Sequence, residues 1–199
     1  HSKFIKPDYA VLLNITNDHL DWHGNLLNYK NSKLKIFIHQ KKNQYALINK
    51  KFKKIYKERD FSGKLLTPKL KNYLKIKDKV KNQYLKLSIN DENMNFVYAF
   101  SKLLKIKEKN FIIALNSFVG LSHRYEIFLK KNNIVFINDS KATSFEATKF
   151  ALSNSKNIYW IFGGLPKKND KIHLSGLKKN IIKSYLIGKN TSFFQKQIQ

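Results

Sequence analysis

The chain has 199 residues, of which 42% are hydrophobic and 26% are charged, which is enough apolar surface for a buried core. It contains no cysteine, which excludes a disulfide framework, a thiolate metal site and a cysteine nucleophile. We expect neither a membrane span nor a secretory leader, because no apolar run approaches the roughly 18 residues that a span needs. These features predict a cytoplasmic α/β protein.

The net charge of +26 comes from 39 lysine and arginine residues against 13 acidic ones. Because lysines neutralise phosphates, a non-catalytic, lysine-rich nucleic-acid-binding module is one hypothesis. Only Arg59 and Arg124 are arginines, however, and the lysines are spread along the whole chain. Abundant Lys, Asn, Ile, Phe and Tyr are typical of an AT-rich genome. We therefore expect weak, salt-sensitive attraction to polyanions and no specific nucleic-acid partner.

Apolar runs and helical spacing alternate in the first half of the chain. Residues 9–15 are typical of a buried strand, and a polar loop over 17–24 follows. Helical spacing over 25–39 and a strand over 44–49 complete one strand–helix–strand crossover. A lysine-rich helix, short antiparallel strands (Tyr84-Leu-Lys-Leu-Ser88 among them) and two helices are expected next, over residues 50–60, 61–88, 91–106 and 109–117.

A turn-like break at 120–124 separates the two halves, and we place a boundary near Leu121 between domains 1–120 and 121–199. Beyond it, two apolar runs flank Lys131-Asn-Asn133, which is a hairpin signal. The two hairpin strands and then a helix, a strand, a helix and a strand are expected over residues 125–129, 134–138, 144–154, 157–162, 176–183 and 185–187. This half is typical of the start of a second β/α sheet domain.

Three polar loops lie where ligands of open α/β sheets bind, just past the carboxyl ends of strands: 16–24, 138–143 and 163–170. The first loop gathers two carboxylates and two imidazoles, from Asp18, His19, Asp21 and His23. Such groups can hold a divalent ion, but solvated loops have the same composition. Both interpretations stay open on spacing alone.

Lys33 differs from most lysines because helical spacing places it inside the apolar arc of residues 25–39. Burial lowers the pKa of an ammonium, and a neutral amine can act as a nucleophile, even toward carbon dioxide. Lys30 falls in the same arc, so periodicity does not choose between the two. A lysine with a buried stem and a solvated ammonium is the alternative.

Further candidates are anion-binding groups. Residues 138–143 close a strand and open a helix, and their acid, ammonium and hydroxyls suit either an anionic ligand or a plain helix cap. Arg124 is suited to clamp a phosphate or to form a surface ion pair. Lys167 and Lys168 follow a Gly-Gly-Leu-Pro turn and are suited to a carboxylate or to a solvated loop.

Four segments, taken in chain order, carry a family resemblance. They are Asn14-Ile-Thr-Asn-Asp-His-Leu-Asp-Trp-His-Gly24, Tyr29-Lys-Asn-Ser-Lys-Leu-Lys-Ile-Phe37, Gly120-Leu-Ser-His-Arg-Tyr-Glu126 and Ile137-Asn-Asp-Ser-Lys-Ala-Thr143. The first two resemble the central ATP-binding domain of the Mur ligases, and the last two resemble the branch that adds D-glutamate to UDP-N-acetylmuramoyl-L-alanine. The last string argues against another Mur ligase or a folylpolyglutamate synthase, which carry an Asp-Tyr-Ala-His-type motif there.

The resemblance implies the later part of a central ATP-binding domain, with a mostly parallel sheet, followed by the first part of a Rossmann-like C-terminal domain. It implies amide-bond formation in peptidoglycan synthesis, in which ATP phosphorylates the alanyl carboxylate and the D-glutamate amine then displaces phosphate. The implied cofactors are ATP and Mg²⁺. The implied partners are UDP-N-acetylmuramoyl-L-alanine and D-glutamate, bound by a cytoplasmic monomer.

The resemblance also assigns roles to individual residues. It makes Lys33, rather than Lys30, a carbamylated lysine that ligates Mg²⁺ together with His19. Three residues are then catalytic: Lys33, His19 and Arg124. Four are assigned to the nucleotide, with the arginine near the γ-phosphate: Asn95, Arg124, Asp139 and Lys141. Three are assigned to D-glutamate: Lys141, Thr143 and Lys167.

The chain departs from the family pattern in several places. It has no Gly-x-x-x-x-Gly-Lys-[Ser/Thr] phosphate loop and no domain for the UDP group. Asp91-Glu92 replaces the usual His-Asn pair before Asn95, and Trp22 stands where a basic residue is common. We therefore expect a fragment of a ligase that is catalytically inactive by itself.

Overall fold

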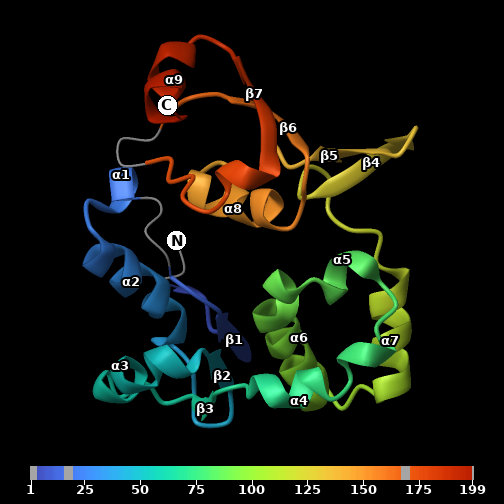
Figure 1. Cartoon of the computed structure of the whole chain (residues 1–199). Coiled ribbons are helices and arrows are strands. Elements are labelled where there is room, and N and C mark those ends of the chain that lie inside the picture. Colours follow the sequence, from blue (N-terminus) through green and yellow to red (C-terminus); the bar gives the residue numbers. More distant parts are fainter. Residues whose placement is uncertain (1–3, 16–19, 167–170, 199) are drawn as a thin grey trace. The chain divides into compact units, whose positions relative to one another are not determined.

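In the computed structural model, which describes residues 4–15, 20–166 and 171–198, the apolar runs of the first half form a parallel sheet. Its strands are β1 (Tyr9–Leu12), β2 (Tyr45–Ile48) and β3 (Lys64–Leu66), in the order β1-β2-β3 (Figure 1). Helix α2 (Leu26–Leu34) connects the first two strands, so the expected strand–helix–strand crossover is confirmed.

The chain separates into two units, residues 1–118 (unit 1) and residues 119–199 (unit 2), and each is described by itself. Besides the sheet and α2, unit 1 contains α1 (Leu20–His23), α3 (Lys53–Glu58), α4 (Leu70–Leu74), α5 (Gln83–Lys86), α6 (Asp91–Leu103) and α7 (Glu108–Ser117). Short 3-10 turns are η2 (Lys35–Phe37), η3 (Lys50–Phe52), η4 (Lys77–Lys79) and η5 (Ser88–Asn90). None of the helices in the described part of the chain is both long and apolar enough to cross a membrane.

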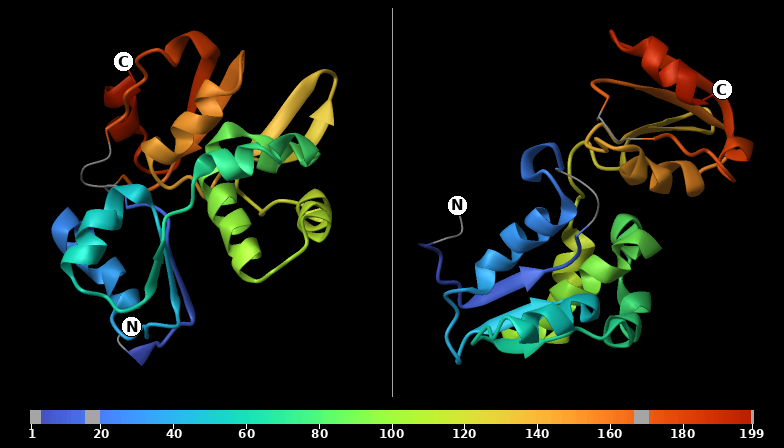
Figure 2. Two further views of the ribbon diagram at one scale, coloured as in Figure 1. Left: turned by 90° about the horizontal axis from the view of Figure 1, so that it is seen from below. Right: turned by 90° about the vertical axis from the view of Figure 1, so that its left-hand side faces the viewer.

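Unit 1 has two apolar cores. The first joins the sheet to α2, η2, η3 and α3 through Leu34, Phe37, Ile48 and Tyr56. The second joins α4, α5, α6 and α7, with Tyr73 at its centre. Figures 1 and 2 show α2 and α3 on one side of the sheet and α6 on the other. The face toward α2 and α3 is therefore buried, whereas on the α6 face Tyr9 and Val11 of β1 remain 38% and 40% exposed.

The prediction of short antiparallel strands over residues 61–88 is wrong. Only β3 forms there, and it pairs in parallel with β2. Alternation predicts a strand over residues 84–88, but the Asn82 side chain caps α5 by accepting a hydrogen bond from the Leu85 amide at 3.0 Å. The loop expected over 17–24 is also partly helical, since α1 begins at Leu20.

Unit 2 begins with the expected hairpin, formed by β4 (Glu126–Lys131) and β5 (Ile134–Asn138). Asn132 and Asn133 have φ of 50° and 62°, the left-handed pair that a tight two-residue turn requires. Helix α8 (Phe145–Ser153), strand β6 (Ile158–Gly163), η6 (Lys178–Asn180), strand β7 (Ile181–Ile187) and α9 (Thr191–Ile198) follow.

The helix expected over 176–183 is wrong. Only the 3-10 turn η6 forms, and β7 begins already at Ile181 and pairs in parallel with β6. The run Ile181-Ile-Lys-Ser-Tyr-Leu-Ile187 is rich in β-branched and aromatic side chains, which favour a strand. The core of unit 2 is small and contains buried Phe145, Leu152 and Leu174.

Candidate functional site

Two loops at the base of the hairpin are bonded to each other in unit 2. The Tyr125 amide donates to Asp139 Oδ1 at 2.9 Å. The Lys141 amide donates to the His123 carbonyl at 3.0 Å. These bonds cross between the residues before β4 and those after β5. The predicted groups Arg124, Asp139 and Lys141 therefore share one end of a two-stranded sheet.

Backbone strain accompanies this pair of loops. His123 and Tyr125 have φ of 66° and 46°, a left-handed conformation that costs non-glycine residues energy. Glu126 offsets that cost because its Oε2 accepts the His123 amide at 2.7 Å. His123 Nδ1 also lies 2.9 Å from Asn138 Nδ2. The exposed Arg124 is thus held between two fixed neighbours.

The surroundings of Asp139 perturb the pKa of its carboxyl. Burial raises the pKa of its carboxyl above the ordinary 3.8, while the Tyr125 amide bond and the charge of Arg124 lower it. Because burial is the larger influence, the pKa of Asp139 is raised overall, and its carboxylate is partly desolvated beside a cation. Such a group is suited to position a bound ligand or a neighbouring cation.

Lys141 and Thr143 have exposed side chains on the turn before α8. The Thr143 amide donates to the Lys141 carbonyl at 3.0 Å, and Ser144 caps α8 by accepting from the Ala147 amide at 3.3 Å. The helix cap is therefore Ser144, which leaves Lys141 and Thr143 available for a ligand.

In unit 1, Lys33 lies on the last turn of α2, and of the two interpretations left open by the sequence the structure has the solvated lysine. Its side chain is exposed and its Nζ stands 5.3 Å from the centre of the Tyr29 ring, while Lys30 is half-buried. The apolar arc fails because only its C-terminal part packs on the sheet, whereas Leu26 is 43% exposed. The Tyr29 ring also contacts His23 of α1, with ring centres 4.9 Å apart.

The remaining predicted residues are divided between α6 and parts that the structure does not describe. Asn95 is buried on α6. His19 and Lys167 lie outside the described residues. Within residues 4–15, 20–166 and 171–198, no three His, Asp or Glu side chains gather as a metal site.

Asp91 and Glu92 have anchoring contacts that sequence reasoning missed. Lys77 Nζ donates to Asp91 Oδ1 at 2.5 Å, and both side chains are largely buried. The Asn49 amide nitrogen Nδ2 donates to Glu92 Oε1, which joins the carboxyl end of β2 to the start of α6. The signal in the sequence was Asn49, a polar residue directly after strand β2, where side chains of α/β sheets often make functional or anchoring contacts. These two acids therefore fix the helix that carries Asn95.

Comparison with known proteins identifies the family. The model of the "Mur ligase middle domain" matches residues 1–118. Two relatives are named UDP-N-acetylmuramoylalanine--D-glutamate ligase. The protein of Wolbachia sp. subsp. Brugia malayi is 37% identical over 96% of this chain and 41% of its own length. That of Rickettsia prowazekii is 35% identical over 93% of this chain and 46% of its own length.

Solved structures agree on the fold. MurF from Acinetobacter baumannii matches all of this chain and 55% of its own, with a TM-score of 0.64 and 14% identity. MurF ligase from Thermotoga maritima, solved in complex with ADP, matches 90% of this chain with a TM-score of 0.56 and 14% identity. The chain belongs to the Mur ligase family. It spans less than half the length of the two curated relatives described above.

Proposed function

We propose that this chain supplies nucleotide- and amino-acid-binding parts of a ligase that joins D-glutamate to UDP-N-acetylmuramoyl-L-alanine with the use of ATP. The bonded pair of loops around Asp139 carries the proposal, because it gathers a guanidinium, a carboxylate and an ammonium at one edge. The names of the relatives support D-glutamate as the amino acid. Unit 1 would then be part of the central ATP-binding domain, and unit 2 part of the C-terminal domain.

The reaction has two steps in this proposal. The γ-phosphoryl group of ATP passes to the alanyl carboxylate with release of ADP, and the D-glutamate amine then attacks the acyl carbon and expels phosphate. Arg124 would offset charge on the transferring phosphoryl group, because a guanidinium presents several donors to phosphate oxygens. Lys141, Thr143 and Lys167 would orient D-glutamate, and Asn95 and Asp139 would contact the nucleotide. A cytoplasmic monomer is part of the same proposal and is supported by the family resemblance.

The described donor set fits Mg²⁺ only after a chemical change at Lys33. Mg²⁺ prefers oxygen ligands, and an ammonium offers none. The exposed amine of Lys33 is accessible to carbon dioxide, and the carbamate formed there would present two oxygens. Lys33 and His19 would then hold the ion, whose chemistry is to offset phosphate charge.

Carbamylation is testable on the chain itself. In ¹³C-bicarbonate, we expect a carbamate resonance that Lys33→Ala removes and Lys30→Ala leaves unchanged. A resonance that survives Lys33→Ala would assign the modification to another lysine. The two variants are matched because both remove one lysine from α2.

Activity is testable in a chimera in which these residues replace the matching segment of the Wolbachia relative. We expect incorporation of D-glutamate in preference to other amino acids. Lys33→Ala should lower turnover by about 10²–10³-fold, since charge-stabilising groups are worth that much. Added bicarbonate should not restore it, whereas a short carboxylic acid should restore part. Lys54→Ala, at an exposed lysine of α3, is the control, and incorporation of a different amino acid would refute the specificity.

A further inference from the structure

Unit 1 contains a lysine-lined cavity among α4, η4, α6 and α7 that the proposed reaction does not use. Its volume is about 420 Å³, and it is broadly open to solvent. Ile76 and Tyr98 contribute apolar surface, and the charged lining residues are Lys75, Lys79, Lys102 and Glu108. Three lysine side chains and one carboxylate therefore line the same space.

Glu108 shows how closely the ammonium groups converge. Its Oε1 lies 2.7 Å from Lys79 Nζ, and its Oε2 lies 3.9 Å from Lys102 Nζ. The Tyr98 hydroxyl donates to Oε2 at 3.3 Å. One side-chain carboxylate thus already gathers two ammonium groups and a hydroxyl, the donor types that an external oxyanion needs.

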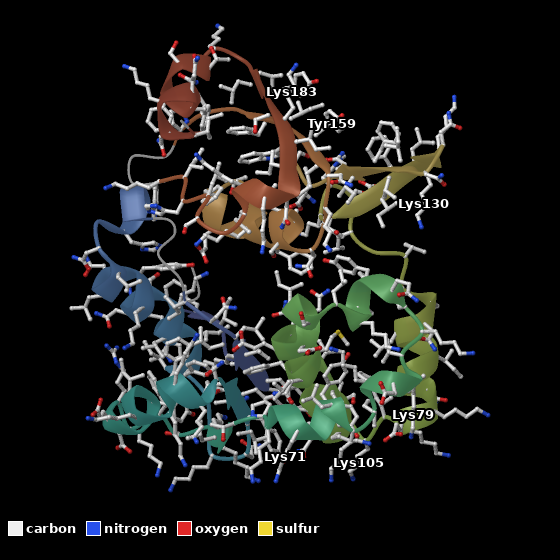
Figure 3. All side chains as sticks on the ribbon, viewed as in Figure 1. Lys71, Lys79, Lys105, Lys130, Tyr159 and Lys183 are labelled. Atoms are coloured by element: carbon white, nitrogen blue, oxygen red, sulfur yellow. The ribbon has the colours of Figure 1, made fainter. Side chains whose placement is uncertain are left out.

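Lys75 supplies positive charge that Glu108 does not neutralise. Among the described residues, no ion pair or hydrogen bond of its side chain is present. The side chains of Lys75, Lys79 and Lys102 are all exposed, so a ligand from solvent can reach them. Figure 3 shows Lys79, with Lys71 and Lys105, extending outward from this unit. Hydrogen bonding from Lys79 lowers the pKa of Glu108, which is consistent with a positive local field.

We propose that this cavity binds a compact, multiply charged phosphate compound, with Glu108 as an internal competitor for the same ammonium groups. Three lysines and one tyrosine hydroxyl suit an oligophosphate better than a monocarboxylate, because one carboxylate leaves the cavity with excess positive charge. The cavity is formed within unit 1 alone and does not depend on the proposed ligase reaction.

The test uses the full 199-residue chain and inorganic tripolyphosphate, with amide chemical shifts as the readout. We expect saturable shifts confined to α4, α6 and α7. Lys75→Gln should weaken binding about tenfold, since one charge-assisted hydrogen bond is lost. Glu108→Gln should tighten binding several-fold. Lys54→Gln, which removes the same charge from an 89% exposed position on α3, should change it by less than about twofold.

Each opposing result is informative. Equal weakening by Lys75→Gln and Lys54→Gln would show diffuse attraction to a chain of charge +26 and would overturn the proposal. Weaker binding in Glu108→Gln would overturn the competitor role. Should Glu108→Gln disturb α7, Lys75→Gln still decides, because Lys75 is exposed and its side chain makes no ion pair or hydrogen bond among the described residues. A short single-stranded oligonucleotide that bound more tightly than tripolyphosphate would identify a nucleic-acid surface in its place.

Discussion

Units 1 and 2 contain similar apolar segments but bury them to different extents. In unit 1, Leu34, Phe37, Tyr73 and Val80 are all fully buried. In unit 2, Ile161 is 65% exposed and Tyr159 is 62% exposed, although both lie on strand β6. The sheet of unit 1 has three strands and buries one face in an apolar core, whereas the sheets of unit 2 have two strands each. Two-stranded sheets are marginal by themselves, so unit 2 should be the less stable unit.

The largest expected effect comes from emptying the core of unit 1. Phe37→Ala should lower the free energy of unfolding of unit 1 by about 3–5 kcal/mol, since the ring packs against Tyr56 and Phe61. Hydrogen exchange of the β2 amides measures this loss, while amides of unit 2 should be unchanged. Ile38→Ala is the control because its side chain is half exposed. Equal losses from both variants would contradict the core described here.

A glycine in unit 2 should give the next largest effect. A Cβ on Gly163 would lie 2.0 Å from the Ile187 carbonyl oxygen, a backbone atom that cannot move aside. Gly163→Ala should therefore destabilise the β6–β7 pair by about 3 kcal/mol. Gly63→Ala in unit 1 should cost less, because its Cβ would meet the end of the Gln40 side chain at 2.7 Å. Exchange rates of amides in β7 and β2 compare the two, and a larger loss in Gly63→Ala would reverse the ranking.

A smaller, pH-dependent effect is expected at Asp139. Its native pKa is raised by burial above the ordinary 3.8, so the native state keeps a proton that the unfolded state releases. The free energy of unfolding of unit 2 should thus fall as pH rises from 3.8 through the raised pKa, and stay lower above it. Asp139→Asn should remove that fall while its amide oxygen still accepts the Tyr125 amide. Denaturant titrations across pH measure this, with exposed Asp78→Asn as control, and an unchanged profile in Asp139→Asn would disprove the assignment.

The smallest effect should come from the exposed face of unit 2. Ile161→Thr should change stability by about 0.5 kcal/mol or less, because most of the side chain is already in water. Phe162→Ala on the same strand should cost more, since its ring stacks on Trp160 with centres 3.7 Å apart. Thermal unfolding with exchange of the β6 amides distinguishes them. A large loss from Ile161→Thr would mean that this face is covered.

Several secondary-structure elements were predicted correctly from the sequence because their signals come from neighbouring residues. The crossover β1–α2–β2 and the hairpin at Asn132 and Asn133 depend on neighbouring residues alone. A helical wheel could not decide between a buried and a solvated Lys33, because it treats every apolar position as packed, whereas Leu26 of the same arc is 43% exposed. The strand predicted over residues 84–88 is wrong because the cap provided by Asn82 favours a helix there, and this local signal outweighs the alternating pattern.

The candidate site was predictable as residue types but not as an arrangement. Asp139 and Arg124 were identified from their segments, yet the bond that joins those segments runs from the Tyr125 backbone across 14 residues. That bond depends on left-handed φ angles at His123 and Tyr125, which no residue pattern indicates for these side chains. The cavity around Glu108 could not be predicted either, because its lysines come from three separate elements whose packing the sequence does not indicate.

The crossed bonds at the base of the hairpin have a mechanical consequence. Because the two loops are bonded to each other and continue into β4 and β5, we expect the hairpin and the backbone of both loops to move together. A displacement at the tip, near Asn132, should therefore reach the backbone of Arg124 and the carboxylate of Asp139 together. A spin label placed at the tip would report motion of groups that lie at the opposite end of the strands.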